Sequence, residues 1–231
     1  MASTVLDLLY PPRCVACGRD DDWLCNRCVR LITVIEPPFC PTCGLPGGPC
    51  ATCRDHPLRM DRIRAVGPHQ GVLQQAIHAL KYGNLTAVAP RLGGLMAATW
   101  RQYGRDVDML IPVPLHPSRQ KSRGYNQSLY LARDIGLRLG LPVAPHGLRR
   151  VRTTQDQIGL GRAERRRNVE GVFDVGPSLS GAGVSSPIGR HILLIDDVCT
   201  TGYTLDACAA PLLRGGVRSV SALVVARRTD G

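Results

Sequence analysis

Hydrophobic residues recur with helical spacing, and in short aliphatic runs, along the part of the chain that follows residue 68. Apolar positions three or four residues apart predict amphipathic helices over residues 71–80, 85–103, 128–139 and 204–214. Short apolar runs predict buried strands over residues 107–113, 191–195 and 217–226. Strands that alternate with helices are typical of an α/β fold with a mainly parallel sheet flanked by helices.

Two prolines fall inside the predicted helices. Pro90 weakens the helical pattern of residues 85–103, and Pro211 is expected to kink the last helix or to end it early. That helix lies between the strands over residues 191–195 and 217–226. A strand, a helix and a second strand in this order predict a parallel unit with a right-handed crossover.

Eight of the ten cysteines form four Cys-x-x-Cys pairs near the N-terminus. The pairs are Cys14 and Cys17, Cys25 and Cys28, Cys40 and Cys43, and Cys50 and Cys53. A two-residue gap lets one tight turn direct two thiolates at the same ion, and two such turns complete the tetrahedral shell that zinc prefers. Pairing in chain order predicts two structural zinc sites of four cysteines each. Reduced thiols without metal, or disulfides, are the alternative.

The cysteine pairs separate a small module, residues 1–57, from an α/β domain, residues 58–231. The module has five prolines between residues 37 and 49 and is too short to bury much apolar surface. We therefore expect bound zinc to supply its folding free energy, on the order of 10–16 kcal/mol per site. Both four-cysteine shells are closed to water, so we expect no catalysis at either of them.

Composition and charge indicate where the protein is located in the cell and what kind of partner it binds. No apolar stretch approaches the roughly 18 residues that a membrane span needs, and residues 1–10 carry no basic residue before their apolar part. These features predict a cytoplasmic protein. The net charge is +11, and after residue 57 the chain holds 24 basic against 12 acidic residues. Arginine binds phosphate through two parallel hydrogen bonds, so this excess favours anionic partners, although a solvated basic surface explains it equally well.

The strongest chemical signal is the run over residues 193–204, which reads LLIDDVCTTGYT. A buried strand carries Asp196 and Asp197 at its carboxyl end, where ligands sit in open α/β sheets. A turn with Gly202 then leads into a helix, whose N-terminal N–H groups favour phosphate. Three hydroxyl groups add donors in this turn: those of Thr200, Thr201 and Thr204.

The two carboxylates suit the hydroxyl groups of a sugar or a hydrated Mg²⁺, and they would be poor ligands for phosphate itself. The run therefore predicts a site for a sugar that carries a phosphate. A capped helix after an acidic turn is the alternative.

This run resembles the 5-phosphoribosyl-1-pyrophosphate (PRPP) motif of type I phosphoribosyltransferases. The whole chain resembles the ComF family, whose members join a double zinc ribbon to such a domain. The resemblance rests on the four cysteine pairs, on the runs LKY (80–82), IPVPLH (111–116) and RGYNQ (123–127), and on Gln157, Leu160, Arg165, Asn168 and Phe173. It implies a type I phosphoribosyltransferase-like fold with a small N-terminal zinc-ribbon module.

The resemblance also implies roles for the residues of the acidic run. Asp196 and Asp197 would meet the ribose hydroxyls, together with Mg²⁺, and the turn that follows would hold the 5-phosphate. The implied PRPP-binding residues of this run are Asp196, Asp197, Val198, Cys199, Thr200, Thr201, Gly202 and Thr204.

Two further segments would complete the site. Residues 112–124 are similar to the loop that grips pyrophosphate, with Arg123 as its cation and Gly124 allowing close backbone approach. Arg123 joins Asp196 and Asp197 in the implied catalytic set, and its alternative is a surface charge at the start of a helix. Residues 157–168 would form a mobile loop that closes over the ligand, or else a solvated basic helix. The loop's cations are Arg162, Arg165, Arg166 and Arg167.

The resemblance implies PRPP binding with magnesium-dependent transfer of the phosphoribosyl group to an acceptor that the sequence does not identify. No side chain stands out as a general base, and Lys81 receives no role beyond a contact with the hood over the site. Cys199 and Cys208 lack evident partners and are expected to be small packing residues. The alternative function is that of an accessory protein in DNA uptake during competence. Such a protein would bind single-stranded DNA and keep PRPP binding as a sensor or a relic.

Overall fold

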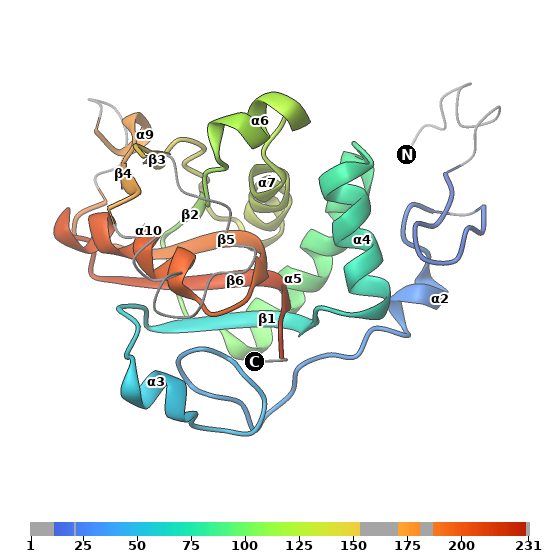
Figure 1. The fold of residues 1–231 in the computed structure, drawn as a ribbon, viewed down its shortest axis with the longest axis horizontal. Coiled ribbons are helices and arrows are strands. Elements are labelled where there is room, and N and C mark those ends of the chain that lie inside the picture. The colour runs from blue at the N-terminus through green and yellow to red at the C-terminus, as the bar shows by residue number, and fades with distance from the viewer. Residues whose placement is uncertain (1–11, 21, 153–170, 181–186, 230–231) are drawn as a thin grey trace.

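A central parallel sheet organises the molecule. The computed structural model describes residues 12–20, 22–152, 171–180 and 187–229. Among these residues, four strands pair in parallel in the order β1-β6-β5-β2, which confirms the predicted mainly parallel sheet (Figure 1). The strands are β1 (Arg62–Pro68), β2 (Met109–Pro112), β5 (His191–Cys199) and β6 (Ser219–Arg227).

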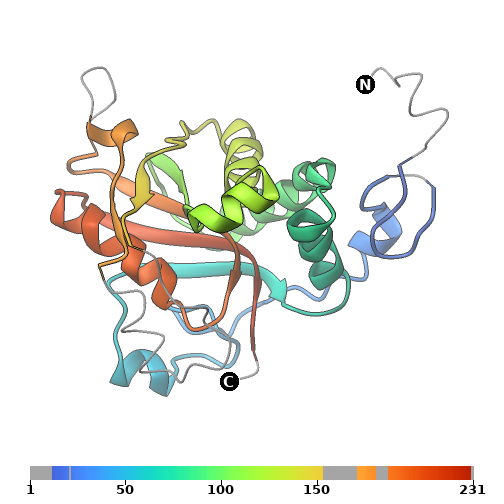
Figure 2. The ribbon, with the colours of Figure 1, turned by 45° about the horizontal axis from the view of Figure 1, so that its top comes forward.

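Helices cover both faces of this sheet. On one face lie α4 (Gly71–Tyr82), the short η1 (Thr86–Val88), α5 (Ala89–Tyr103) and α7 (Gln127–Leu139), whose apolar side chains share a core with Leu193 and Ile195 of β5. On the other face, α10 (Tyr203–Arg214) packs in a second core with Ile192 and Leu194 (Figure 2). Alternate residues of a strand point to opposite faces, so a strand buried on both faces is an uninterrupted apolar run.

The helix boundaries follow from local chemistry. Pro90 lies in the first turn of α5, where a missing N–H costs nothing, so it starts the helix and does not interrupt it. The Asn126 side chain caps α7 by accepting from the Ser128 N–H. Pro211 does not end α10 early, because the helix continues to Arg214.

Several elements were not predicted from the sequence. Strand β1 is one, and β5 extends four residues beyond the predicted strand, so the acidic pair lies inside it. A short helix, α6 (Pro117–Arg123), occupies part of the predicted pyrophosphate loop, and Arg123 ends a helix here instead of opening one. The remaining short elements are β3 (Leu148–Arg150) and β4 (Phe173–Val175), which pair antiparallel, and α9 (Pro177–Ser180).

The part of the chain before β1 packs against the sheet domain (Figure 1). The part that contains α2 (Asn26–Val29) lies beside α4, and the part that contains α3 (Ala51–Asp55) lies along β1. The Ile35 N–H donates to the carbonyl of Val66 at 2.9 Å, and the Ile63 N–H donates to that of Thr42 at 2.6 Å. These bonds cover the outer edge of β1, which would otherwise present unpaired backbone groups.

Across the described residues, no helix combines the length and the apolar character that crossing a membrane would require.

Candidate functional site

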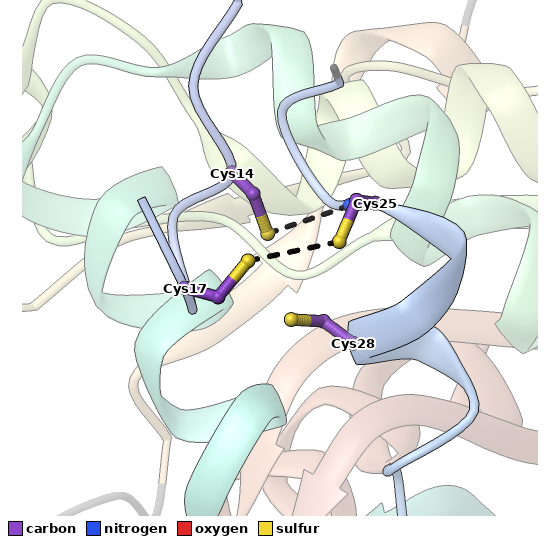
Figure 3. A group of neighbouring side chains, drawn as sticks. All are labelled: Cys14, Cys17, Cys25 and Cys28. Atoms are coloured by element: carbon purple, nitrogen blue, oxygen red, sulfur yellow. Dashed lines mark hydrogen bonds between the residues drawn. The ribbon is translucent and has the colours of Figure 1, made fainter. Parts of the chain in front are cut away.

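The eight paired cysteines gather into two clusters in chain order. Each cluster holds four Sγ atoms that lie within 4.8 Å of one another. The first consists of Cys14, Cys17, Cys25 and Cys28 (Figure 3), and the second of Cys40, Cys43, Cys50 and Cys53.

The spacing of the sulfur atoms fits zinc. The Sγ atoms of Cys17 and Cys25 are 3.8 Å apart, and those of Cys43 and Cys50 are 3.6 Å apart. A tetrahedral ion with Zn–S bonds of about 2.3 Å separates its sulfur ligands by about 3.8 Å. Both clusters therefore have the donor set and the dimensions of structural zinc-ribbon sites.

The electrostatics of the thiols also favour a cation. Burial would raise the pKa of Cys14, but the backbone N–H groups of Cys25, Ala16 and Cys17 outweigh it and lower the pKa to about 6. Burial and the neighbouring thiols raise the pKa of Cys28. One cluster thus contains a thiol that ionises readily and a thiol that resists ionisation beside it. A bound divalent cation removes this conflict, because it stabilises every thiolate that coordinates it.

The second candidate site is the carboxyl end of β5, where Asp197 is held by two side chains from other elements. Lys81 Nζ of α4 lies 2.7 Å from Asp197 Oδ1, and the side chain of Asp197 is only 4% exposed. Gln127 Nε2 at the start of α7 donates to Asp197 Oδ2 at 2.6 Å. Both oxygens of this buried carboxylate therefore have a partner.

Asp196 has a different environment. Its Oδ1 accepts from the Ser128 hydroxyl at 2.9 Å and from the Asp197 N–H at 2.9 Å. Burial and the adjacent Asp197 carboxylate raise the pKa of Asp196 to about 7, although Lys81 and these hydrogen bonds act in the opposite direction. The carboxyl group of Asp196 is therefore expected to change its protonation state near neutral pH.

Gln127 also connects the acidic pair to the predicted pyrophosphate segment. Arg123, the last residue of α6, donates to Gln127 Oε1 at 2.5 Å, while the amide nitrogen of Gln127 faces Asp197. The guanidinium of Arg123 also lies 5.5 Å from the centre of the Tyr82 ring. Gly124 follows in the left-handed region at φ +80°, where a side chain would be strained. Arg123, Gln127 and Asp197 therefore form a continuous polar chain across three elements.

The turn after β5 leads directly into α10. Gly202 is the residue before this helix, with φ +87°. Because glycine has no side chain, this capping residue cannot hydrogen-bond to the N–H groups of the first turn of α10. The first N–H groups of a helix have no acceptor within the helix. The hydroxyl-bearing Thr200, Thr201 and Thr204 are partly buried around them. This turn can donate several hydrogen bonds to an anion.

The two remaining cysteines differ from each other. Cys208 belongs to α10 and is fully buried on the side of the helix that faces the core, as expected of a packing residue. The expectation that Cys199 lacks a close partner is wrong, because Arg227 Nη1 lies 2.6 Å from its Sγ. The two residues end adjacent parallel strands and pair in register, so the fold brings their side chains together.

The structure thus gathers Asp196, Asp197 and Arg123 around Gln127 and Ser128, and it places the turn of residues 200–204 at the same end of β5. The proposed loop cations Arg162, Arg165, Arg166 and Arg167 lie outside the described residues. Sequence reasoning did not assign Lys81, Gln127 or Ser128 to the site. Gln127 belongs to the RGYNQ run, which was the only signal that could have pointed to it.

Comparisons with known proteins match this architecture. A family model described as a double zinc ribbon domain matches residues 5–56, and one described as a phosphoribosyl transferase domain matches residues 137–231. With the parallel sheet and the two cysteine clusters, these matches define a phosphoribosyltransferase-like protein that carries zinc ribbons at its N-terminal end.

Relatives that align with most of the chain identify a family within this class. The chain is 30% identical over 214 residues to "DNA utilization protein YhgH" of Salmonella typhi, with 88% of this chain and 90% of the relative covered. It is 29% identical over 228 residues to "Competence protein F" of Haemophilus influenzae, with 93% and 96% covered. It is 26% identical over 220 residues to "Competence protein ComFC" of Bacillus subtilis, with 90% and 86% covered. The chain belongs to the ComF family.

Proposed function

We propose that this protein binds PRPP together with Mg²⁺ at the carboxyl end of β5. The observation that carries the proposal is the order of groups at this end of β5: two carboxylates, a hydroxyl-rich turn and the N-terminus of α10, whose capping residue is Gly202. The acidic pair supplies acceptors for the ribose hydroxyls or for the water shell of Mg²⁺. The turn from Thr200 to Thr204 supplies donors for the 5-phosphate.

The diphosphate of PRPP is assigned to the segment that ends at Gly124. Arg123 offers a fixed fork of N–H donors, and its hydrogen bond to Gln127 orients it toward the acidic pair. The glycine that follows lets the backbone approach the ligand closely. The arginines of residues 157–168 are proposed to add charge when PRPP is bound.

The reaction we propose is transfer of the phosphoribosyl group. The bond between C1 of the ribose and the pyrophosphate oxygen breaks as an acceptor forms a new bond at C1, and the electron pair leaves with pyrophosphate. Bound Mg²⁺ would neutralise the charge of the departing group. Arg123 would hold that group in place, so the contribution of the chain is positioning and electrostatics. The acceptor is not proposed.

Zinc has a separate, structural role in this proposal. Each four-cysteine cluster closes its coordination shell and leaves no position for water. We assign residues 1–57 to the zinc-ribbon module and residues 58–231 to the PRPP-binding domain.

Calorimetry tests the PRPP site. We expect PRPP to bind the wild-type protein in the presence of Mg²⁺, and we expect the Asp196→Asn/Asp197→Asn variant to give no binding heat. Equal heats for the two proteins would contradict the proposal. A pyrophosphate-release assay with a panel of bases and nucleic acids then tests for transfer.

A second function is direct binding of single-stranded DNA, which the net charge of +11 and the names of the relatives favour. Released counterions would make this binding sensitive to salt, so affinity should fall by about 0.7 log units per log unit of salt for each phosphate contacted. Fluorescence anisotropy with a labelled oligonucleotide measures this slope. An affinity that does not change with salt would remove this function.

A further inference from the structure

The two adjacent carboxylates of β5 are held in unequal ways. We propose that Lys81 and Gln127 are positioning residues that fix Asp197 in the interior, and that Asp196 is the carboxylate that contacts the ligand. This inference rests on the proposed PRPP site and assigns a different role to each of its two aspartates.

The first observation concerns the oxygens of Asp197. Oδ1 pairs with Lys81 Nζ and Oδ2 accepts from Gln127 Nε2, at 2.7 and 2.6 Å. The carboxylate is 4% exposed, so a ligand would have to displace one of these partners to reach it. The side chain of Lys81 is 21% exposed, so this partner of the buried carboxylate lies nearer the surface than Asp197 itself.

The second observation concerns Asp196. Its two hydrogen bonds, from Ser128 and from the backbone of Asp197, both end on Oδ1. Within the described residues Oδ2 accepts no hydrogen bond, and the residue is only partly buried. Asp196 therefore keeps one oxygen available to a hydroxyl group or to a metal-bound water.

The third observation concerns how the chain anchors this arrangement. The buried side chain of Gln127 uses its amide nitrogen on Asp197 and its amide oxygen on Arg123. An amide can bridge a carboxylate and a guanidinium only in this one orientation. Gln127 thus fixes two groups relative to each other: the Asp197 carboxylate, behind the proposed ribose site, and the Arg123 guanidinium of the diphosphate segment.

A double-mutant cycle on Lys81 and Asp197 tests whether the two aspartates have these separate roles. Removing one member of a buried ion pair leaves the other uncompensated, whereas removing both members costs much less. We expect Lys81→Met to weaken Mg²⁺–PRPP binding at least about tenfold. We expect the double variant Lys81→Met/Asp197→Asn to return to within about threefold of wild type, because both charges are gone and Asp196 remains. Asp196→Asn should lose binding whether or not Lys81 is changed.

Two further variants provide controls. Lys81→Arg keeps the cation and should retain more affinity than Lys81→Met. Arg149→Met removes a cation from the exposed pair with Asp174 on the short antiparallel sheet, where the side chains are 60% and 47% exposed, and should bind as wild type. Calorimetry gives the affinities, and circular dichroism confirms that each variant is folded.

A measurement without ligand separates this inference from the proposed function. Asp196 is faced by Asp197 from its own strand, by Lys81 from α4, by Ser128 from α7 and by Cys208 from α10. The positive charge of Lys81 lowers the pKa of Asp196. Lys81→Met removes this charge and should therefore raise the pKa of the Asp196 carboxyl group, which ¹³C NMR can follow.

The outcomes are distinct. If wild type binds PRPP and Lys81→Met binds equally well, the positioning role is overturned and the PRPP site stands. A double variant that does not recover shows that Asp197 itself contacts the ligand, which also overturns the division. If wild type binds no PRPP, the proposed function fails, and the titration then decides alone: an unmoved Asp196 overturns the role of Lys81.

Discussion

At the residue scale, the chemistry of the proposed site depends on the different environments of two adjacent carboxyl groups, Asp197 buried and Asp196 partly buried. Asp197 has a lysine partner 116 positions earlier in the chain, and the donors in direct contact with Asp196 are, within the described residues, neutral. Motif spacing identified the two aspartates, because their place after an apolar run is a local property. It could not identify Lys81, because only the packing of α4 against the sheet brings that ammonium group to Asp197.

The raised pKa of Asp196 makes PRPP affinity depend on pH. Burial and Asp197 raise this pKa to about 7, so the group binds a proton below that pH, whereas the proposed ligand contact needs the carboxylate. Affinity should therefore rise with pH through about 7, by up to about tenfold per pH unit below the pKa. Calorimetry at several pH values, in two buffers of different ionisation enthalpy, measures the affinity and the proton released on binding. Equal affinities at pH 6 and pH 8 would contradict this expectation.

At the element scale, the site depends on the junction between β5 and α10. Hydrophobic periodicity predicted both elements, because each buries a regular set of apolar side chains. Hydrophobic periodicity predicted that the strand ends at residue 195, because the two aspartates that follow interrupt the apolar pattern. The pairing of β5 with β6 continues to Cys199 and overrides that local signal.

Strand β1 shows the same limitation. Its arginines read as polar positions, yet Arg64 is buried and donates to the carbonyls of Tyr103, Pro41 and Ile63. Its guanidinium also lies 4.5 Å from the centre of the Phe39 ring. An arginine buried by carbonyl groups and an aromatic ring cannot be recognised from hydrophobic periodicity, because Phe39, Pro41 and Tyr103 all lie outside β1 and reach it only in the fold.

The glycine before α10 provides a test of this junction. Gly202→Ala places a Cβ at φ +87°, 3.2 Å from side-chain carbons of both Ile63 and Leu58. The left-handed conformation alone should cost about 1–2 kcal/mol in the free energy of unfolding. We also expect weaker PRPP binding, because the first turn of α10 must shift. Urea unfolding and calorimetry measure the two effects.

Gly189→Ala is the matched control. Gly189 has φ +72°, and apart from its chain neighbours no atom of the described residues lies within 4 Å of the position that a Cβ would take there, so the substitution is expected to carry the backbone cost alone. It should lower the free energy of unfolding and leave PRPP binding unchanged. Equal PRPP affinity in Gly202→Ala and Gly189→Ala would show that the turn does not hold the phosphate.

At the scale of the whole molecule, the cysteine-rich segment is joined to the sheet at its edge. The cysteine spacing predicted both clusters and their membership. It could not predict that the segment would contact β1, because those contacts are backbone hydrogen bonds and the contacts of the Arg64 side chain with Phe39 and Pro41, and hydrophobic periodicity signals neither kind. The boundary after residue 57 stays a prediction.

Zinc loss at one cluster should have a local effect on β1. We expect two zinc ions per chain in wild type and one in either Cys17→Ser or Cys50→Ser. The Ile63 amide, bonded to Thr42 between the cysteines of the second cluster, should exchange faster in Cys50→Ser and remain protected in Cys17→Ser. Metal analysis and hydrogen exchange measure the two effects. An Ile63 amide equally protected in both variants would show that the second cluster does not hold the edge of the sheet.

The most direct test of the PRPP site is a crystal structure of the protein with Mg²⁺ and PRPP. We expect the 5-phosphate on the N–H groups at the start of α10, the ribose hydroxyls at Asp196, and the diphosphate beside Arg123. PRPP ordered elsewhere on the molecule, or a carboxyl end of β5 that stays empty at saturating PRPP, would contradict the proposed site.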